Sequence, residues 1–380
     1  MELVRLNKND YDELIALLNG AFSRKNNREM DFEKDLPKMC VRDDKHMSNH
    51  LGIKEDGKLV AVIGIYPLPT VIGQEEVLFS TVGNIATHWD YTGKGYMSLL
   101  LDEAMKELEI IGADVSRLGG LRQRYARYGY ESCGQNYHFT LTAHNVKNCF
   151  PCAGENVEFI QIEKTDKNAL AFARALYEKS GIYLKRDGDD MYNCMVAWQN
   201  IPYLALKNGE MVGYLCVNKA ENEISEMYAT TQEEYENVLV AWQRRVQASV
   251  VFHAPAYDIN LIRTFSGICE GMYPSSASHF KIIHFEKVAN ALMKLKASYT
   301  PLQTGEFVME IDGYATIKLF VNERGVGCVK TQEKAQITVS KAQASRLLFG
   351  PFAPQYTAEV PTIASAWLPL PLSWNLQNRV

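Results

Sequence analysis

The residues best placed to do chemistry lie between Phe79 and Tyr96, in the segment FSTVGNIATHWDYTGKGY. An apolar run that predicts a β-strand leads into a loop with two glycines, Gly93 and Gly95, and a helix follows at once. Glycines let the backbone approach a ligand closely, and the free N–H groups at a helix start point at anions. The segment therefore predicts a site for the phosphates of a cofactor.

Two common phosphate-binding motifs do not fit this loop. The dinucleotide fingerprint G-x-G-x-x-G requires a third glycine where this chain has Ser98, and the Walker sequence G-x-x-x-x-G-K-[ST] is absent. A glycine pair also occurs in tight turns that bind nothing, so this simpler interpretation stays open. A second motif downstream bears on the choice.

This second motif is LRQRYARYGYE, which spans Leu121–Glu131. Together with the loop Thr92-Gly93-Lys94-Gly95-Tyr96-Met97, it resembles the GNAT acetyltransferases. Their acetyl-CoA loop is usually R/Q-x-x-G-x-G/A, and many close the site with a Tyr before an aromatic-Gly-Tyr/Phe-Glu turn. This chain departs from the family pattern at Thr92, where the family has Arg or Gln, and at Met97, where it has a small residue.

The resemblance implies that acetyl-CoA is the acyl donor and that two backbone segments hold it. The loop would bind the diphosphate through Thr92, Gly93, Lys94, Gly95 and Tyr96, and the preceding strand would align the pantetheine arm through Ile85, Ala86 and Thr87. Backbone N–H groups of that strand could stabilise an oxyanion. Tyr125 would protonate the leaving CoA thiolate, because a phenol with a pKa of about 10 stays protonated at neutral pH. No metal is required.

The elements that position these residues can be predicted from local patterns. Apolar residues recur at helical spacing after the loop, at Met97, Leu101, Ala104, Met105 and Leu108. Gly112 ends that helix, and a short strand follows over 113–118. A hairpin over 51–65 turns at Asp56-Gly57. In a GNAT fold the region after the first helix covers the acceptor pocket, so Phe22, Met30 and Phe32 are candidate acceptor contacts, with a plain surface helix as the alternative.

Length and composition bound the class of protein. A chain of 380 residues predicts two or three domains, and a net charge of −5 argues against a nucleic-acid surface. No stretch approaches 18 uninterrupted apolar residues, and the N-terminus carries no signal peptide, so we expect no membrane span and a cytoplasmic location.

The cysteines predict thiols rather than a metal or redox centre. Eight are scattered along the chain, which suggests a reducing compartment. Cys149 and Cys152 form one C-x-x-C pair with His144 upstream, but a zinc site usually has a second pair. We therefore interpret the pair as inert and residues 145–154 as a linker.

The middle of the chain repeats the first part. LALKNGEMVGYL at 204–215 matches LGIKEDGKLVAV at 51–62, with glycine turns at Gly209 and Gly57. A strand, a loop, a helix and another strand follow each copy. The second loop has no glycine and carries Glu233 and Glu234, whose charges would repel a diphosphate. We expect residues 155–285 to keep the fold without binding CoA.

The last part has a different pattern. A helix with Val288, Leu292, Met293 and Leu295 precedes alternating apolar runs that predict strands. This segment resembles the sterol-carrier-protein-like domain of the enhanced intracellular survival (Eis-type) acetyltransferases. The resemblance implies an α/β (α+β) protein with mixed central sheets: an active GNAT domain over 1–144, a linker over 145–154, a degenerate GNAT-like domain over 155–285 and a sterol-carrier-protein-like domain over 286–380. Eis-type relatives form hexamers, which makes a homo-oligomer an expectation.

The tail WLPLPLSWNL at 367–376 is apolar, so we expect it to be packed. In the Eis-type family the chain end reaches the first domain and its carboxylate is the base, which by position implies Val380. A base is needed because an amine with a pKa near ~10 arrives protonated. The alternatives are that the tail only fixes the third domain, or that His88 is the base, since histidine titrates near neutral pH.

The function predicted is acetyl transfer from acetyl-CoA to a primary amine. Two alternatives stay open: a GNAT-fold protein of weak or no activity that binds or regulates, and a transferase that uses another acyl donor. The amine itself cannot be inferred from the sequence.

Overall fold

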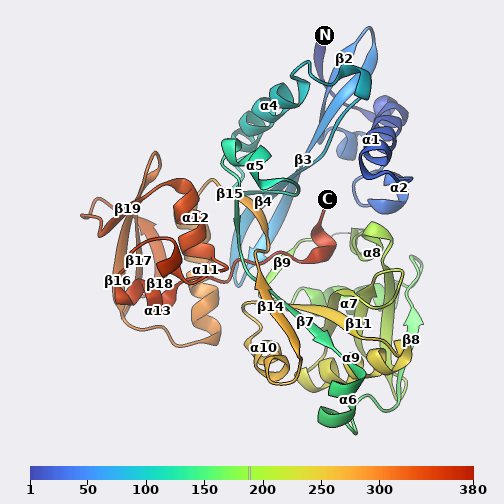
Figure 1. The fold of residues 1–380 in the computed structure, drawn as a ribbon, viewed down its shortest axis with the longest axis vertical. Helices are drawn as coiled ribbons and strands as arrows, with labels where there is room; N and C mark the ends of the chain where they lie inside the picture. Colours follow the sequence, from blue (N-terminus) through green and yellow to red (C-terminus); the bar gives the residue numbers. More distant parts are fainter. Residues whose placement is uncertain (187, 189) are drawn as a thin grey trace.

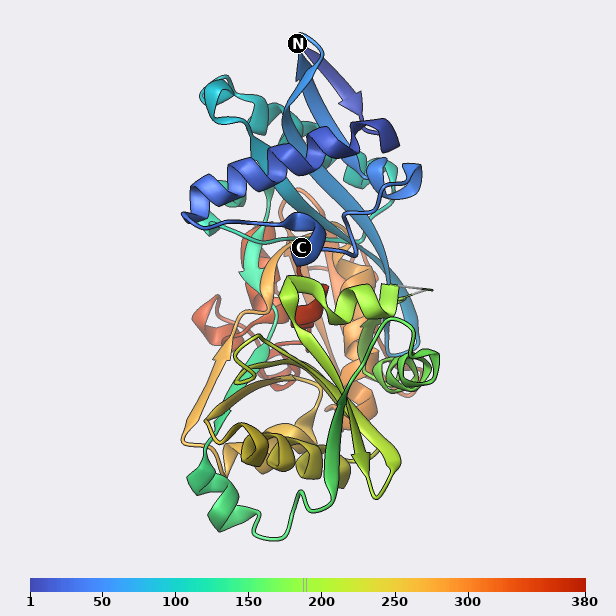
Figure 2. The same ribbon diagram turned by 90° about the vertical axis from the view of Figure 1, so that its right-hand side faces the viewer.

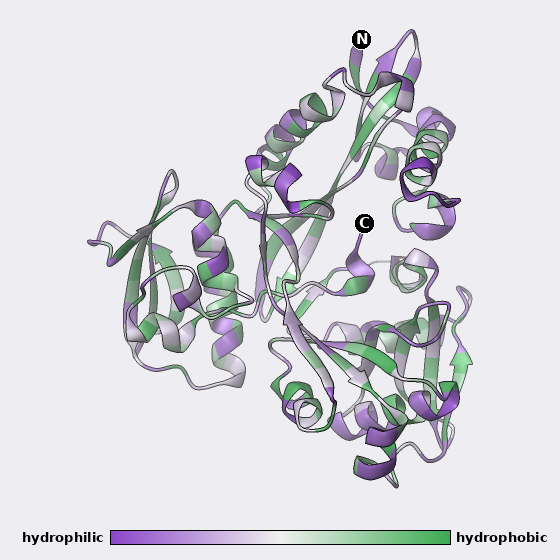
Figure 3. Cartoon of the chain, viewed as in Figure 1, coloured by the Kyte–Doolittle hydropathy of each residue, from purple (hydrophilic) through white to green (hydrophobic). Residues whose placement is uncertain are grey.

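The computed structural model describes residues 1–186, 188 and 190–380. The chain forms three units, with the first and second stacked along the long axis and the third beside them (Figure 1). Both views place the C-terminus between the first unit and the second (Figures 1 and 2). Hydrophobic residues concentrate along the strands of each unit, whereas polar residues cover the outward faces of many helices (Figure 3).

The first unit is built on an eight-stranded mixed sheet. Its strand order is β1-β2-β3-β4-β5-β15-β6, and β9 pairs with the far end of β3. The β4–β5 pair is parallel and the others are antiparallel. The strands are β1 (Glu2–Arg5), β2 (His50–Glu55), β3 (Lys58–Ile72), β4 (Glu75–Thr87), β5 (Val115–Leu118), β6 (Glu131–Cys133), β9 (Ile182–Leu184) and β15 (Ser278–Ile282).

Five helices belong to this unit: α1 (Tyr11–Asn26), α2 (Phe32–Asp35), α3 (Asp44–Met47), α4 (Tyr96–Ile110) and α5 (Arg122–Tyr125). Helix α4 buries Leu100, Leu101, Ala104 and Leu108, which share one face at helical spacing. Helix α1 crosses in front of the sheet in Figure 2 and buries Leu14, Leu17 and Leu18.

The second unit has two smaller sheets, ordered β12-β11-β10-β8 and β13-β7-β14. Its strands are β7 (Asn136–Leu141), β8 (Val157–Gln161), β10 (Ile201–Lys207), β11 (Glu210–Val217), β12 (Ile224–Ala229), β13 (Val250–Pro255) and β14 (Gly271–Ser275). Its helices are α6 (Ala143–Cys149), α7 (Lys167–Tyr177), α8 (Asp190–Met195), α9 (Gln232–Val246) and α10 (Ile259–Ser266). Helix α6 occupies the start of the segment predicted to be a linker.

The two units exchange strands. Strand β7, which follows β6 of the first unit, lies between β13 and β14 of the second. Strand β15, which follows β14 of the second unit, lies between β5 and β6 of the first. The pairing therefore crosses the predicted boundary at residue 144 in both directions, which the sequence repeat did not indicate.

The third unit has one four-stranded sheet, ordered β18-β17-β16-β19, in which β16 and β19 are parallel. Its strands are β16 (Gly305–Ile311), β17 (Ala315–Asn322), β18 (Gly325–Lys330) and β19 (Ile337–Val339), and its helices are α11 (Phe285–Tyr299), α12 (Lys341–Phe349) and α13 (Thr362–Trp367). Residues from α11, this sheet and the tail share a core with Phe79 and Val115 of the first unit.

Local predictions agree with these elements. The turn at Asp56-Gly57 has φ values of 49° and 78°, and the turn at Asn208-Gly209 has values of 52° and 84°. Positive φ at both central residues is what a type I′ hairpin requires. The predicted α/β class with mixed sheets is confirmed, whereas the likeness of the third unit to a sterol-carrier protein stays a prediction.

Candidate active site

The site forms where β4 and β5 separate. The parallel pairing runs from Phe79 opposite Val115 to Val82 opposite Leu118, and β5 then ends while β4 continues to Thr87. The register of β4 against β3 shifts here, and Asn84 has a φ of 51°. A bulge of this kind bends a strand away from its neighbour. Among the described residues, no strand pairs with this edge of β4 over 83–87, which includes the predicted residues Ile85, Ala86 and Thr87.

The glycine loop lies beyond the end of β4 and opens α4. Gly93 and Gly95 have φ values of 85° and 83°, and Gly95 is the N-cap residue of α4. A Cβ atom at either position would have no atom within 4 Å. The first turn of α4 has no acidic residue. Open space at a helix start without negative charge fits the diphosphate of acetyl-CoA.

Two predicted loop side chains are engaged elsewhere. The Thr92 hydroxyl donates to the Trp89 carbonyl oxygen at 2.8 Å. The Lys94 ammonium pairs with Glu55 at 3.0 Å and lies 4.5 Å from the centre of the Tyr91 ring. Tyr96 is buried among the apolar residues around α4. A diphosphate at this loop would therefore depend on backbone N–H groups more than on these side chains.

Tyr125 lies shortly after the end of β5. It ends α5 and is 6% exposed, and its ring packs over Gly120, where a Cβ atom would lie 3.0 Å from the Tyr125 Cε2 atom. Gly120 comes two residues after the end of β5, and Tyr125 belongs to the same apolar cluster as Val82 of β4. Burial raises the pKa of Tyr125, which keeps the phenol protonated at neutral pH.

The tail is packed, as its apolar pattern predicted, and Val380 belongs to an apolar cluster of the first unit. Trp367, Leu370, Leu372 and Trp374 are buried, and the Trp374 ring stacks on Phe79 with 5.8 Å between centroids. Val380 reaches the bulge of β4, where a Cβ atom on Gly83 would lie 2.9 Å from Val380 Cγ1. The last residue is thus brought to the point where β4 leaves β5.

The backbone of α8 and the side chain of Arg186 hold the tail end in place. Gln377 donates from Nε2 to the carbonyl oxygens of Cys194 and Met195 at 2.8 and 2.7 Å. Arg186 donates to Asn378 Oδ1 at 2.8 Å. Gln377 and Asn378 are 1% and 5% exposed, so these polar groups depend on protein partners for their hydrogen bonds.

The candidate acceptor contacts lie around Val380. Phe22, Met30 and Phe32 belong to the same apolar cluster as Val380, and the rings of Phe22 and Phe32 are 4.9 Å apart. His88, by contrast, lies at the other end of the free β4 edge, about 16 Å from Gly83 at the usual rise per residue. Its Nδ1 atom accepts the Asp90 N–H at 3.3 Å, so this nitrogen caps the turn that follows.

A buried polar chain supports the bulge and was missed by sequence reasoning. Asn84 donates from Nδ2 to the Tyr66 hydroxyl at 2.6 Å, and this hydroxyl lies 2.8 Å from His50 Nε2. Because the Tyr66 hydroxyl oxygen accepts the hydrogen bond from Asn84, its O–H donates to His50 Nε2. The other ring nitrogen, Nδ1–H, then donates to the Met47 carbonyl oxygen at 3.3 Å. Burial lowers the pKa of His50 to about 4, so the ring is neutral.

Sequence reasoning also missed two buried cations near the tail. The Lys38 ammonium donates to the Gln377 carbonyl oxygen, and burial lowers its pKa to about 8. Arg117 donates from Nε to Ser278 Oγ at 2.8 Å and faces the Trp374 ring at 5.7 Å, and burial lowers its pKa to about 9. No motif contains either residue, since each is brought to the tail by long-range packing.

Within the described residues, no group of three or more His, Cys, Asp or Glu side chains is arranged to hold a metal ion. Cys149 and Cys152 are both exposed free thiols. Over the same part of the chain, no helix combines the length and apolar character needed to span a bilayer.

Residues 2–133 match the family model of the acetyltransferase (GNAT) domain. No curated protein matches the chain. Three solved structures share the fold over almost the whole length. A probable N-acyltransferase from Enterococcus faecalis has a TM-score of 0.69 at 15% identity and covers 98% of both chains. A GCN5-related N-acetyltransferase from Anabaena variabilis has a TM-score of 0.69 at 14% identity, again covering 98% of both chains. An Eis protein from Mycobacterium abscessus has a TM-score of 0.68 at 14% identity and covers 99% of this chain and 98% of its own.

Proposed function

We infer that this acyltransferase, whose residues 2–133 form a GNAT domain, transfers an acetyl group from acetyl-CoA to a primary amine. One observation carries the proposal: β5 ends at Leu118 while β4 continues to Thr87, and Val380 packs on Gly83 where the two strands separate. The open helix start at Gly95 and the buried phenol of Tyr125 support it. Acetyl-CoA supplies a thioester-activated acetyl group. The loop over 92–96 would bind its diphosphate, and the β4 edge over 85–87 would align its pantetheine arm.

We assign the two proton transfers to the Val380 carboxylate and the Tyr125 phenol. The carboxylate that Val380 carries in this sequence accepts the proton of the amine, directly or through water, as the nitrogen attacks the thioester carbonyl. Backbone N–H groups of β4 stabilise the negative charge that develops on the carbonyl oxygen. Tyr125 gives its proton to the sulfur as the C–S bond breaks.

The experiment that tests the donor is binding of acetyl-CoA followed by thermal unfolding. We expect an increase in the melting temperature at millimolar acetyl-CoA, because a ligand that binds only the folded state stabilises it. No shift would contradict the enzyme proposal and favour the alternative of a GNAT-fold binding protein. A comparison with longer acyl-CoA thioesters distinguishes the other alternative, a different acyl donor.

The experiment that tests the base compares two changes at the chain end. Deletion of Arg379 and Val380 should abolish acetyl transfer without unfolding the protein, since the buried contacts of Gln377 and Asn378 remain. Extension by one glycine after Val380 should also abolish transfer, because it moves the carboxylate away from Gly83. Full activity in both variants would assign the base to water or His88.

A screen of primary amines that follows thiol release would identify the acceptor. The hexamer implied by the resemblance and the cytoplasmic location stay predictions, which size-exclusion chromatography with light scattering and cell fractionation would test.

A further inference from the structure

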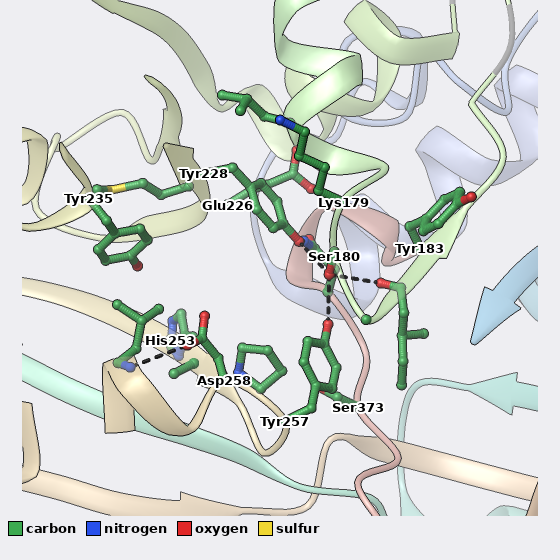
Figure 4. Close-up of a pocket in the computed structure, with 18 of the residues that line it drawn as sticks. Lys179, Ser180, Tyr183, Glu226, Tyr228, Tyr235, His253, Tyr257, Asp258 and Ser373 are labelled. Carbon is green, nitrogen blue, oxygen red and sulfur yellow. Dashed lines mark hydrogen bonds between the residues drawn. The ribbon is translucent and has the colours of Figure 1, made fainter. Parts of the chain in front are cut away.

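A cavity of about 710 Å³ lies in the second unit, where β12 and β13 separate (Figure 4). The two strands meet at a parallel bridge between Glu223 and Val251, and β12 is an edge strand of its sheet. In topology this is the counterpart of the split between β4 and β5. The tail forms one wall of the cavity with Ser373, Trp374 and Asn375. The volume falls in the range of small-molecule sites.

Aromatic side chains surround this cavity. Tyr228, Tyr235, Tyr257 and Trp374 all belong to its lining. On one side the hydroxyls are satisfied: Tyr257 lies 2.8 Å from Ser180 Oγ, and Tyr228 donates to the same atom at 3.4 Å. Tyr235 differs, because its ring is 8% exposed and its hydroxyl points into the cavity without a hydrogen-bond partner among the described residues (Figure 4). This hydroxyl is therefore available to a ligand in the cavity.

The lining also contains a carboxylate without a cation. Asp258 accepts the Leu261 N–H at 3.2 Å as the N-cap of α10, and it makes no ion pair with the described residues. Burial raises the pKa of Asp258, and Tyr235 and Tyr257 line the same cavity (Figure 4). The other lining carboxylate, Glu226, is neutralised by Arg186 at 2.7 Å.

The remaining charges disfavour an anion. The first turn of α9, beside the cavity, carries Glu233 and Glu234, of which Glu234 pairs with Lys207 at 2.7 Å. In a cofactor-binding loop, a diphosphate lies at such a helix start. Lys179 also lines the cavity, but its side chain is exposed to solvent. A phosphate ligand would meet negative charge at the helix start, whereas a cation would meet Asp258 and aromatic rings.

We propose that this cavity binds a small organic cation, an alkylated ammonium compound with a hydroxyl or carbonyl group. The ammonium lies against Asp258 and the rings of Tyr235 and Tyr257, and the oxygen-bearing group pairs with the Tyr235 hydroxyl. A charge that is both paired with a carboxylate and placed over aromatic rings is recognised by two independent interactions. This site is separate from acetyl transfer, because a quaternary ammonium compound has no N–H to acetylate.

The test is calorimetric titration of the full-length protein with choline, with its neutral isostere in which a tert-butyl group replaces the trimethylammonium, and with inorganic phosphate. Choline should bind at least ~10-fold more tightly than the isostere. Equal binding of the two, tighter binding of phosphate, or no binding of choline would each overturn the proposal.

Two variants locate the site. Asp258→Asn keeps a side chain that caps α10 but removes the charge, so choline affinity should fall about 10-fold without loss of folding. Asp43→Asn, which changes the N-cap of α3 in the same way, should leave affinity unchanged. Tyr235→Phe should retain tetramethylammonium affinity and weaken choline. Wild-type choline affinity in Asp258→Asn would show that the cation does not bind at this carboxylate.

Discussion

Val380 packs directly against Gly83: a Cβ atom on Gly83 would lie 2.9 Å from Val380 Cγ1 and 3.9 Å from the Val380 carbonyl carbon. The last residue of the sequence thereby touches the bulge at which β4 leaves β5. A position with no side chain leaves room for the tail end at that point. A substitution at Gly83 can therefore displace the proposed base, the Val380 carboxylate, without removing it.

Gly83→Ala should displace Val380, because no Cβ contact is tolerated at that distance. We expect acetyl transfer to fall by about 10- to 100-fold, since small misplacements of a reacting group are costly. Binding of acetyl-CoA should change little. Steady-state rates and calorimetry measure the two effects. Gly267→Ala is the control, because its nearest atom would be 3.8 Å away. Normal rates of acetyl transfer in Gly83→Ala would show that the position of Val380 does not affect the reaction.

Tyr125→Phe should lower kcat by about 100-fold and leave the Kd for acetyl-CoA nearly unchanged. The ring still packs over Gly120, and only the proton donor is lost. The matched control is Tyr130→Phe, which removes a buried hydroxyl that lies 2.6 Å from Ser116 Oγ. That change should cost about 1 kcal/mol in stability without an effect on kcat. If Tyr125→Phe retains full turnover, the phenol is not the acid.

Gly95→Ala should weaken acetyl-CoA binding by at least ~10-fold, because a left-handed conformation costs a residue with a Cβ about 1–2 kcal/mol and the loop would shift. Gly57→Ala introduces the same strain at a φ of 78° in the β2–β3 turn. Both variants should lose stability, but only Gly95→Ala should lose affinity in a calorimetric titration. Equal affinities of the two variants for acetyl-CoA would show that the loop around Gly95 does not bind the cofactor.

His50 makes the region around the bulge sensitive to acid. Its pKa is lowered to about 4 in the folded protein, from an ordinary value of 6.5, so the folded state binds fewer protons between these values. The free energy of unfolding therefore falls as pH drops from 6.5 to 4, by about 3 kcal/mol from this group.

His50→Gln should remove the pH-dependent contribution of His50 to the free energy of unfolding. The Gln amide oxygen can accept a hydrogen bond from the Tyr66 hydroxyl, and the amide does not titrate. Chemical denaturation at pH 7 and at pH 4.5 measures the difference. The unfolding free energy of the variant should depend less on pH than that of the wild type. An identical pH dependence in the two proteins would show that His50 does not titrate on unfolding in this range.

Much of the first two units could be predicted because the signals in the sequence are local. Asp56-Gly57 and Asn208-Gly209 are adjacent pairs whose backbone preferences select one kind of turn. Gly93 and Gly95 with the following apolar spacing predict the helix start directly. The bulge at Asn84 could not be predicted in this way, because its partners Tyr66 and His50 come from other strands. Lys38 and Arg117 were missed for the same reason.

The sequence alone determined the glycine loop, the hairpins, the helix that follows the loop and the apolar character of the tail, because each depends on residues near one another in the chain. Only the tertiary structure decided that β7 and β15 exchange sheets and that Val380 lies against Gly83. Such contacts join residues far apart in sequence, and their stability comes from surfaces buried together rather than from any local pattern.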